Sequence, residues 1–88
     1  MDVSQLSINT AVTLAEVYRY ADTIFRASPP EAASRRQRKI RRWMCRYIRN
    51  MPELPKETRR KLLHCEQAAF FAFLQHCMAV AREWERDR

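Results

Sequence analysis

The sequence predicts an all-α protein, and three observations lead to that fold class. The chain has 88 residues, which is enough for one domain at most. It contains no glycine, the residue that supplies the positive φ angles of tight hairpin turns and phosphate-binding loops. Hydrophobic residues make up 47% of the chain and recur at helical spacing. We therefore expect residues 1–88 to form a single domain, a three-helix antiparallel bundle with a long C-terminal helix.

The first helix is expected over about residues 10–27, after a frayed segment of residues 1–9. Its apolar positions follow the spacing of one helical face. They are Leu14, Val17, Tyr18, Ala21 and Phe25. Thr13 with Glu16, or an earlier Ser or Asn, can cap the start of this helix.

The second helix is expected over about residues 29–51. Ser28, the two prolines after it and Glu31 form a capping box with proline at the first helical positions. The apolar stripe consists of Ile40, Trp43, Met44, Tyr47, Ile48 and Met51. Asn50 is expected to end the helix in the left-handed conformation, and Pro52 prevents its continuation.

The third helix is expected over about residues 56–86, after a short connection that contains two prolines. A tight connection of this kind places the second and third helices antiparallel. The apolar stripe of the third helix comprises Leu62, Leu63, Ala69, Phe70, Phe73, Leu74, Cys77, Val80, Ala81 and Trp84. Phe71 lies off this stripe, so it is a candidate for contact with a partner.

Positive charge is concentrated in the middle of the chain. The net charge is +7, yet residues 35–62 hold twelve Lys and Arg against two Glu, which gives +10 for that segment. The second helix carries most of it, with no acidic residue interspersed: Arg35, Arg36, Arg38, Lys39, Arg41, Arg42, Arg46 and Arg49. Like charges three or four residues apart destabilise a helix. We therefore expect this face to bind an acidic protein, nucleic acid or an anionic membrane surface, with a merely solvated face as the alternative.

No catalytic or metal-binding arrangement is recognisable in the sequence. His64 and Cys65 are neighbours, and neighbouring side chains on a helix point about 100° apart, so they cannot form a nucleophile–base pair. Cys65 and Cys77 align on one continuous helix but lie roughly 18 Å apart there, too far to share a metal. We predict a protein that is not an enzyme and binds no metal.

The remaining sequence signals concern the cellular environment. Three cysteines without close pairing indicate free thiols in a reducing, intracellular compartment. No apolar run approaches the ~20 residues of a membrane span. The N-terminus matches neither a secretory signal nor an arginine-rich transit peptide.

One local pattern resembles a known family. Val17-Tyr18-Arg19 precedes a basic helix that ends in Tyr47-Ile48-Arg49-Asn50, and a long helix follows. In length, charge and helix order, residues 14–80 resemble the LYR-motif (complex I LYR) family of small three-helix mitochondrial proteins. Val17 stands where the family has leucine, and Tyr47 where it has phenylalanine. The chain departs from the family at Asp22-Thr23 and Trp43-Met44, where a hydrophobic–Arg and an Ile–Arg pair are usual.

The resemblance implies a non-catalytic adaptor, on the matrix side of mitochondria, that docks the acidic acyl carrier protein and supports assembly or stability of a respiratory or other mitochondrial complex. It implies no directly bound cofactor; the partner would present an acyl-phosphopantetheine whose acyl chain inserts between the helices. Partner-binding candidates are then Tyr18 and Arg19 with the eight basic residues of the second helix. The implied acyl-chain tunnel is lined by Leu14, Val17, Met44, Ile48, Phe70, Phe73 and Leu74.

The alternative is a small basic helical regulator, of phage, viral or bacterial type, that binds nucleic acid or inhibits a partner enzyme. The lack of Asn or Gln among the arginines of Arg41–Arg49 argues against base-specific reading, since adenine edges favour those side chains. Non-specific phosphate binding stays open.

Overall fold

All regular structure in the described part of the chain is helical. The computed structural model describes residues 6–26 and 33–87. Its helices are α1 (Ile8–Phe25), α2 (Ala33–Arg49), α3 (Lys56–His64) and α4 (Gln67–Arg86). The predicted all-α class is therefore confirmed. The predicted three-helix bundle with a long C-terminal helix is wrong in its helix number, because the segment expected to form one helix over residues 56–86 is divided into α3 and α4.

Helix α1 begins two residues earlier than predicted because Ser7 caps it. The Ser7 hydroxyl accepts a hydrogen bond from the backbone N–H of Thr10 at 3.1 Å, and Ser7 itself has an extended backbone. A side-chain oxygen at this position satisfies an amide that has no partner within the helix. The helix ends at Phe25, and residue 27, where the prediction ended it, lies outside the described residues.

Helix α2 ends differently from the prediction. No described residue has a positive φ angle, so the left-handed conformation expected at Asn50 is wrong. The Asn50 side chain instead donates to the carbonyl of Arg46 at 3.1 Å and satisfies a terminal carbonyl directly. Met51 and Leu54 beyond the helix are both buried, so the connection packs against the core. The capping box predicted at Ser28 to Glu31 lies outside the described residues.

The break between α3 and α4 occurs at two residues with extended backbone, Cys65 and Glu66. In a continuous helix Glu66 would follow Leu62 by one turn and would share its buried face. With the break, Leu62 and Phe70 are both fully buried while Glu66 is exposed. The interruption therefore keeps a carboxylate out of an apolar core, where its burial would be costly.

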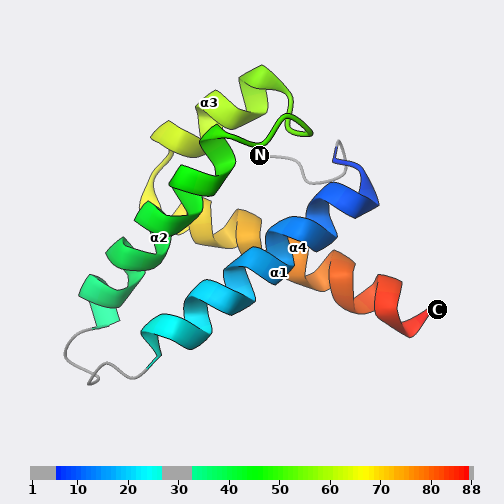
Figure 1. Cartoon of the computed structure of the whole chain (residues 1–88), viewed down its shortest axis with the longest axis horizontal. Coiled ribbons are helices and arrows are strands. Elements are labelled where there is room, and N and C mark those ends of the chain that lie inside the picture. The colour runs from blue at the N-terminus through cyan, green and yellow to red at the C-terminus, as the bar shows by residue number, and fades with distance from the viewer. Residues whose placement is uncertain (1–5, 27–32, 88) are drawn as a thin grey trace.

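One core joins the four helices. Helix α1 packs against both α2 and α4, and it crosses α4 in the view of Figure 1, while α3 lies beside the end of α2. The largest fully buried side chains are Phe70, Leu14, Met44, Ile48, Leu54, Leu62, Leu74 and Cys77. Each helix thus contributes buried apolar side chains to the same interior, although Tyr47 and Ala69 of the predicted stripes are exposed.

Among the described residues, no helix combines the length and the apolar character that crossing a bilayer requires.

Candidate protein-binding surface on helix α2

The basic residues of α2 divide into exposed and partly buried side chains. Arg36 and Arg41 are partly buried and flank the exposed face of the helix on its two sides. The other six are exposed: Arg35, Arg38, Lys39, Arg42, Arg46 and Arg49. Most of the charge that the sequence places on this helix therefore faces solvent on a single side.

Ion pairs among the described residues lie elsewhere on the molecule. Arg26 pairs with Asp22 at 2.9 Å on α1, and Lys61 pairs with Glu57 at 3.8 Å on α3. The remaining pair joins Arg19 of α1 to α4. No basic side chain of α2 takes part in these pairs, so the exposed charge of α2 is not neutralised by the part of the chain that the structure describes.

Arg41 has a structural role that sequence reasoning did not foresee. Its guanidinium donates to the side-chain oxygen of Gln67 at 2.9 Å and to the carbonyl of Cys65 at 2.5 Å. The same group lies over the ring of Phe70, 4.7 Å from the ring centroid. Arg41 was predicted as a partner-binding residue, and in the structure its contacts with Cys65, Gln67 and Phe70 tie the α3–α4 break to α2.

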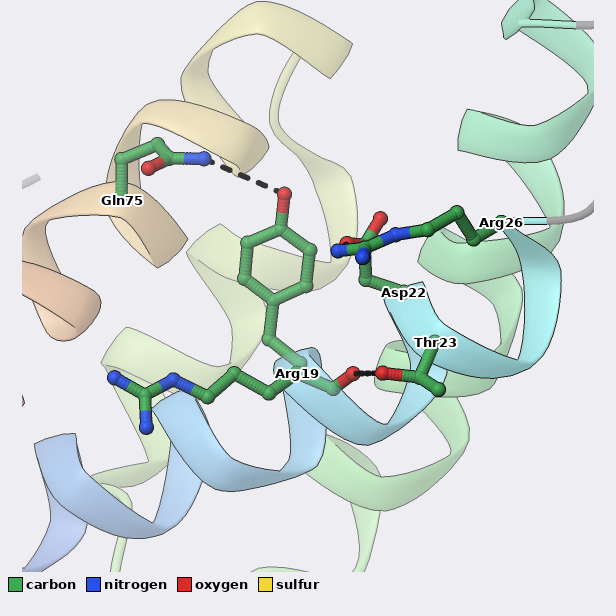
Figure 2. Close-up of polar contacts among 6 residues, drawn as sticks. Arg19, Asp22, Thr23, Arg26 and Gln75 are labelled. Carbon is green, nitrogen blue, oxygen red and sulfur yellow. Dashed lines mark hydrogen bonds and ion pairs between the residues drawn. The ribbon is translucent and has the colours of Figure 1, made fainter.

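The Val17-Tyr18-Arg19 segment faces α4. The Tyr18 hydroxyl accepts a hydrogen bond from the Gln75 amide at 3.4 Å (Figure 2), and its ring meets Phe71 edge-on at 6.1 Å. Arg19 is exposed and pairs with Glu85 at 3.7 Å. Burial, with the nearby charge of Asp22, raises the pKa of the Tyr18 hydroxyl. These two candidate binding residues thus make contacts with α4 within the molecule.

A polar pocket adjoins this segment on the α1–α4 side. It has a volume of about 420 Å³, and Figure 2 shows several of the side chains around it. Its lining consists of Tyr18, Arg19, Asp22, Thr23, Arg26, Gln75 and Met78. Because Arg26 is paired with Asp22, much of the local charge is balanced within the pocket.

The residues assigned to an acyl-chain tunnel lie together in the core. Val17 is partly buried and packs against the others. The other six are buried: Leu14, Met44, Ile48, Phe70, Phe73 and Leu74. The described pockets are lined by other residues. The seven residues therefore belong to one core cluster in this structure, and the acyl-chain tunnel stays a prediction.

The feature that sequence reasoning missed is a groove beside Trp43. One pocket of about 480 Å³ lies at the C-terminal end of α2. A second pocket of about 200 Å³ lies closer to the N-terminus of the same helix. Both are lined by Trp43 and Arg46, so they adjoin each other at these two side chains. The complete lining is Phe25, Lys39, Arg42, Trp43, Arg46, Tyr47, Asn50, Met51, Pro52 and Glu53. We call this surface the Trp43 groove.

Exposed aromatic side chains border the Trp43 groove. Tyr47 was expected in the core, yet it is 41% exposed. Tyr20 of α1 is 59% exposed, and its ring lies 5.7 Å from that of Trp43. Tyr20 lies off the apolar stripe of α1 in the sequence, and this spacing could have predicted that its side chain is exposed. Phe71, expected to face a partner, is partly buried against Tyr18 and Phe70.

The buried thiol of Cys77 offers little reactive chemistry. Burial raises the pKa of the Cys77 thiol to about 12, so it stays protonated and unreactive at neutral pH. Cys45 and Cys65 are free and partly buried. Within the described residues, no group of three or more His, Cys, Asp or Glu side chains is placed to hold a metal ion.

Comparison of the chain with models of known protein families, with curated proteins and with solved structures gives no match.

Proposed function

We propose that this protein is a non-catalytic adaptor that docks an acidic protein on the outer face of α2. The observation that carries the proposal is the set of six exposed basic side chains without an ion pair among the described residues. Clustered like charges lower the stability of the helix that carries them. An acidic partner would relieve this repulsion and would be steered to the surface by it.

The surroundings of the charge favour a protein partner over nucleic acid. The Trp43 groove offers apolar surface next to the basic side chains, as protein interfaces do. A long anionic polymer would use only the charges, whereas a folded acidic partner would also use the aromatic side chains.

The acylated mitochondrial acyl carrier protein, which the LYR resemblance implies, is the first partner to test. An adaptor of that kind would support the assembly or stability of a mitochondrial complex. Because Leu14, Phe70 and Leu74 are fully buried in one core, an acyl chain would have to displace packed side chains to enter between the helices. The contributions of surface charge and of the acyl chain to binding affinity can therefore be measured separately.

The test is calorimetric titration of the protein with acylated carrier, with unacylated carrier and with duplex DNA. We expect the acylated and unacylated carrier to bind through the same charged face, with affinity that falls as salt is raised. Tighter binding of the acylated form would indicate that the acyl chain enters the core. Binding of the duplex without binding of either carrier form would contradict the proposal and favour the nucleic-acid regulator.

A further inference from the structure

We infer that the Trp43 groove is the docking site for an acidic amphipathic helix of the partner. This inference rests on the proposed function, because it takes the partner to be an acidic protein. It goes further by assigning the contact to one side of α2 and by stating the shape and chemistry of the bound segment. The argument combines the apolar floor of the groove, its basic rim and its length.

The floor of the groove is apolar and partly open. Trp43 lines both pockets, and Met51 and Pro52 line the larger one. Tyr47 is 41% exposed on the floor, and Tyr20 extends the aromatic surface onto α1 through its contact with Trp43. Partly exposed aromatic side chains grouped in this way are typical of the centre of a protein interface.

The rim of the groove is basic and fits carboxylates. Lys39, Arg42 and Arg46 line it and are exposed, and no ion pair among the described residues involves them. A segment that presents apolar side chains to the floor must therefore carry acidic residues along its edge. Charge complementarity of this kind fixes the orientation of a partner and speeds its association.

The length of the groove suits a helix. On or next to α2 the lining residues run from Lys39 to Asn50, eleven positions apart, which corresponds to roughly 16 Å along a helix axis. A bound helix of about three turns spans that distance and offers apolar side chains at positions i, i+3, i+4 and i+7. The occupant is thus an amphipathic helix with Glu or Asp flanking its apolar face.

The six exposed basic residues of α2 provide a matched control. Three of them line the groove: Lys39, Arg42 and Arg46. Three others lie on the same helix and do not line the described groove: Arg35, Arg38 and Arg49. Replacing either trio by glutamine removes the same charge from the same exposed helix. Only a partner seated in the groove distinguishes the two variants.

The probe is a fluorescein-labelled peptide of about eighteen residues, with leucine at i, i+3, i+4 and i+7 and glutamate beside that face. Its anisotropy is measured against the full-length protein and both trio variants, with circular dichroism to verify that helicity is unchanged. We expect the groove trio variant to bind at least about tenfold more weakly and the outer trio variant within about threefold of the wild type. Tyr47→Ala, which keeps every charge, should weaken binding by about three- to tenfold.

Several outcomes would overturn the inference while leaving the proposed function intact. Equal losses in the two trio variants would mean that charge alone attracts the peptide. Equal binding of a scrambled peptide of identical composition would mean that the amphipathic pattern is not recognised. If the peptide fails to bind while vesicles containing phosphatidylserine bind in a groove-dependent way, the groove is a lipid contact. Failure of both this peptide and every acidic protein tested would remove the proposed function as well.

Discussion

Polar side chains are paired where α1 faces α4, whereas most of the basic side chains of α2, on the other neighbour of α1, are exposed. On the side that faces α4, charged and polar groups are paired with one another: Arg19 with Glu85, Arg26 with Asp22, and Gln75 with Tyr18. On the side that faces α2, the neighbouring helix exposes six basic residues without an ion pair among the described residues. The difference shows that arginine content alone does not identify a binding face.

Arg41 and Arg46 illustrate the same distinction within one helix. Both belong to the basic cluster seen in the sequence. Arg41 makes three contacts around the α3–α4 break, whereas Arg46 is exposed and lines the Trp43 groove. A basic residue whose donors are satisfied within the molecule contributes to stability. One that is exposed beside apolar surface is available to a partner.

The largest effect is expected from removing Arg41. Arg41→Ala takes away two charge-assisted hydrogen bonds and the contact with Phe70, and should lower the free energy of unfolding by about 2–3 kcal/mol. Urea unfolding followed by circular dichroism measures this change. The matched variant Arg42→Ala, one residue along and exposed, should stay within about 0.5 kcal/mol of the wild type. Similar losses in both variants would contradict the division of α2 into structural and free arginines.

Alkaline pH should lower the free energy of unfolding. Burial raises the pKa of Cys77 from 9.0 to about 12, so above pH 9 the unfolded chain releases a proton that the folded chain retains. Stability is therefore complete below about pH 9 and falls as pH rises towards 12, by about 1.4 kcal/mol per pH unit at most. The raised pKa of Tyr18 acts in the same direction above pH 10.

Urea titrations at pH 8, 9.5 and 10.5 measure this dependence. Cys77→Ala removes the buried thiol, so its stability should fall less steeply with pH than that of the wild type, whatever its starting stability. Parallel pH profiles for the two proteins would show that the Cys77 thiol is not the titrating group.

A smaller effect of opposite sign is expected from reversing one charge in the groove. Arg42 lies four residues from both Arg38 and Arg46, so Arg42→Glu converts two repulsive pairs into attractive ones. The free energy of unfolding should rise by about 1 kcal/mol at low ionic strength, and the gain should shrink as salt is added. Binding of the acidic peptide should weaken in the same variant. Lower stability of Arg42→Glu in low salt would show that the arginines are not mutually repulsive.

The sequence was informative about helices and their buried faces, and less so about where side chains from separate segments meet. The stripes of α1 and α2 and the buried Phe70, Phe73 and Leu74 follow from periodicity, because helical spacing is a local property. Tyr47 also fits the stripe spacing, yet it is an exposed side chain in the folded protein. The sequence predicts on which face of α2 Tyr47 lies, but it does not predict how much of that face a neighbouring helix buries.

By itself, the sequence determined the all-α class, the strongly basic α2 and most of the core. Only the tertiary structure decided the break at Cys65 and Glu66, the structural role of Arg41 and the existence of the Trp43 groove. The reason is physical. A stripe arises from residues three or four positions apart, whereas Arg41 reaches a carbonyl 24 residues away, and such contacts exist only once the helices have docked.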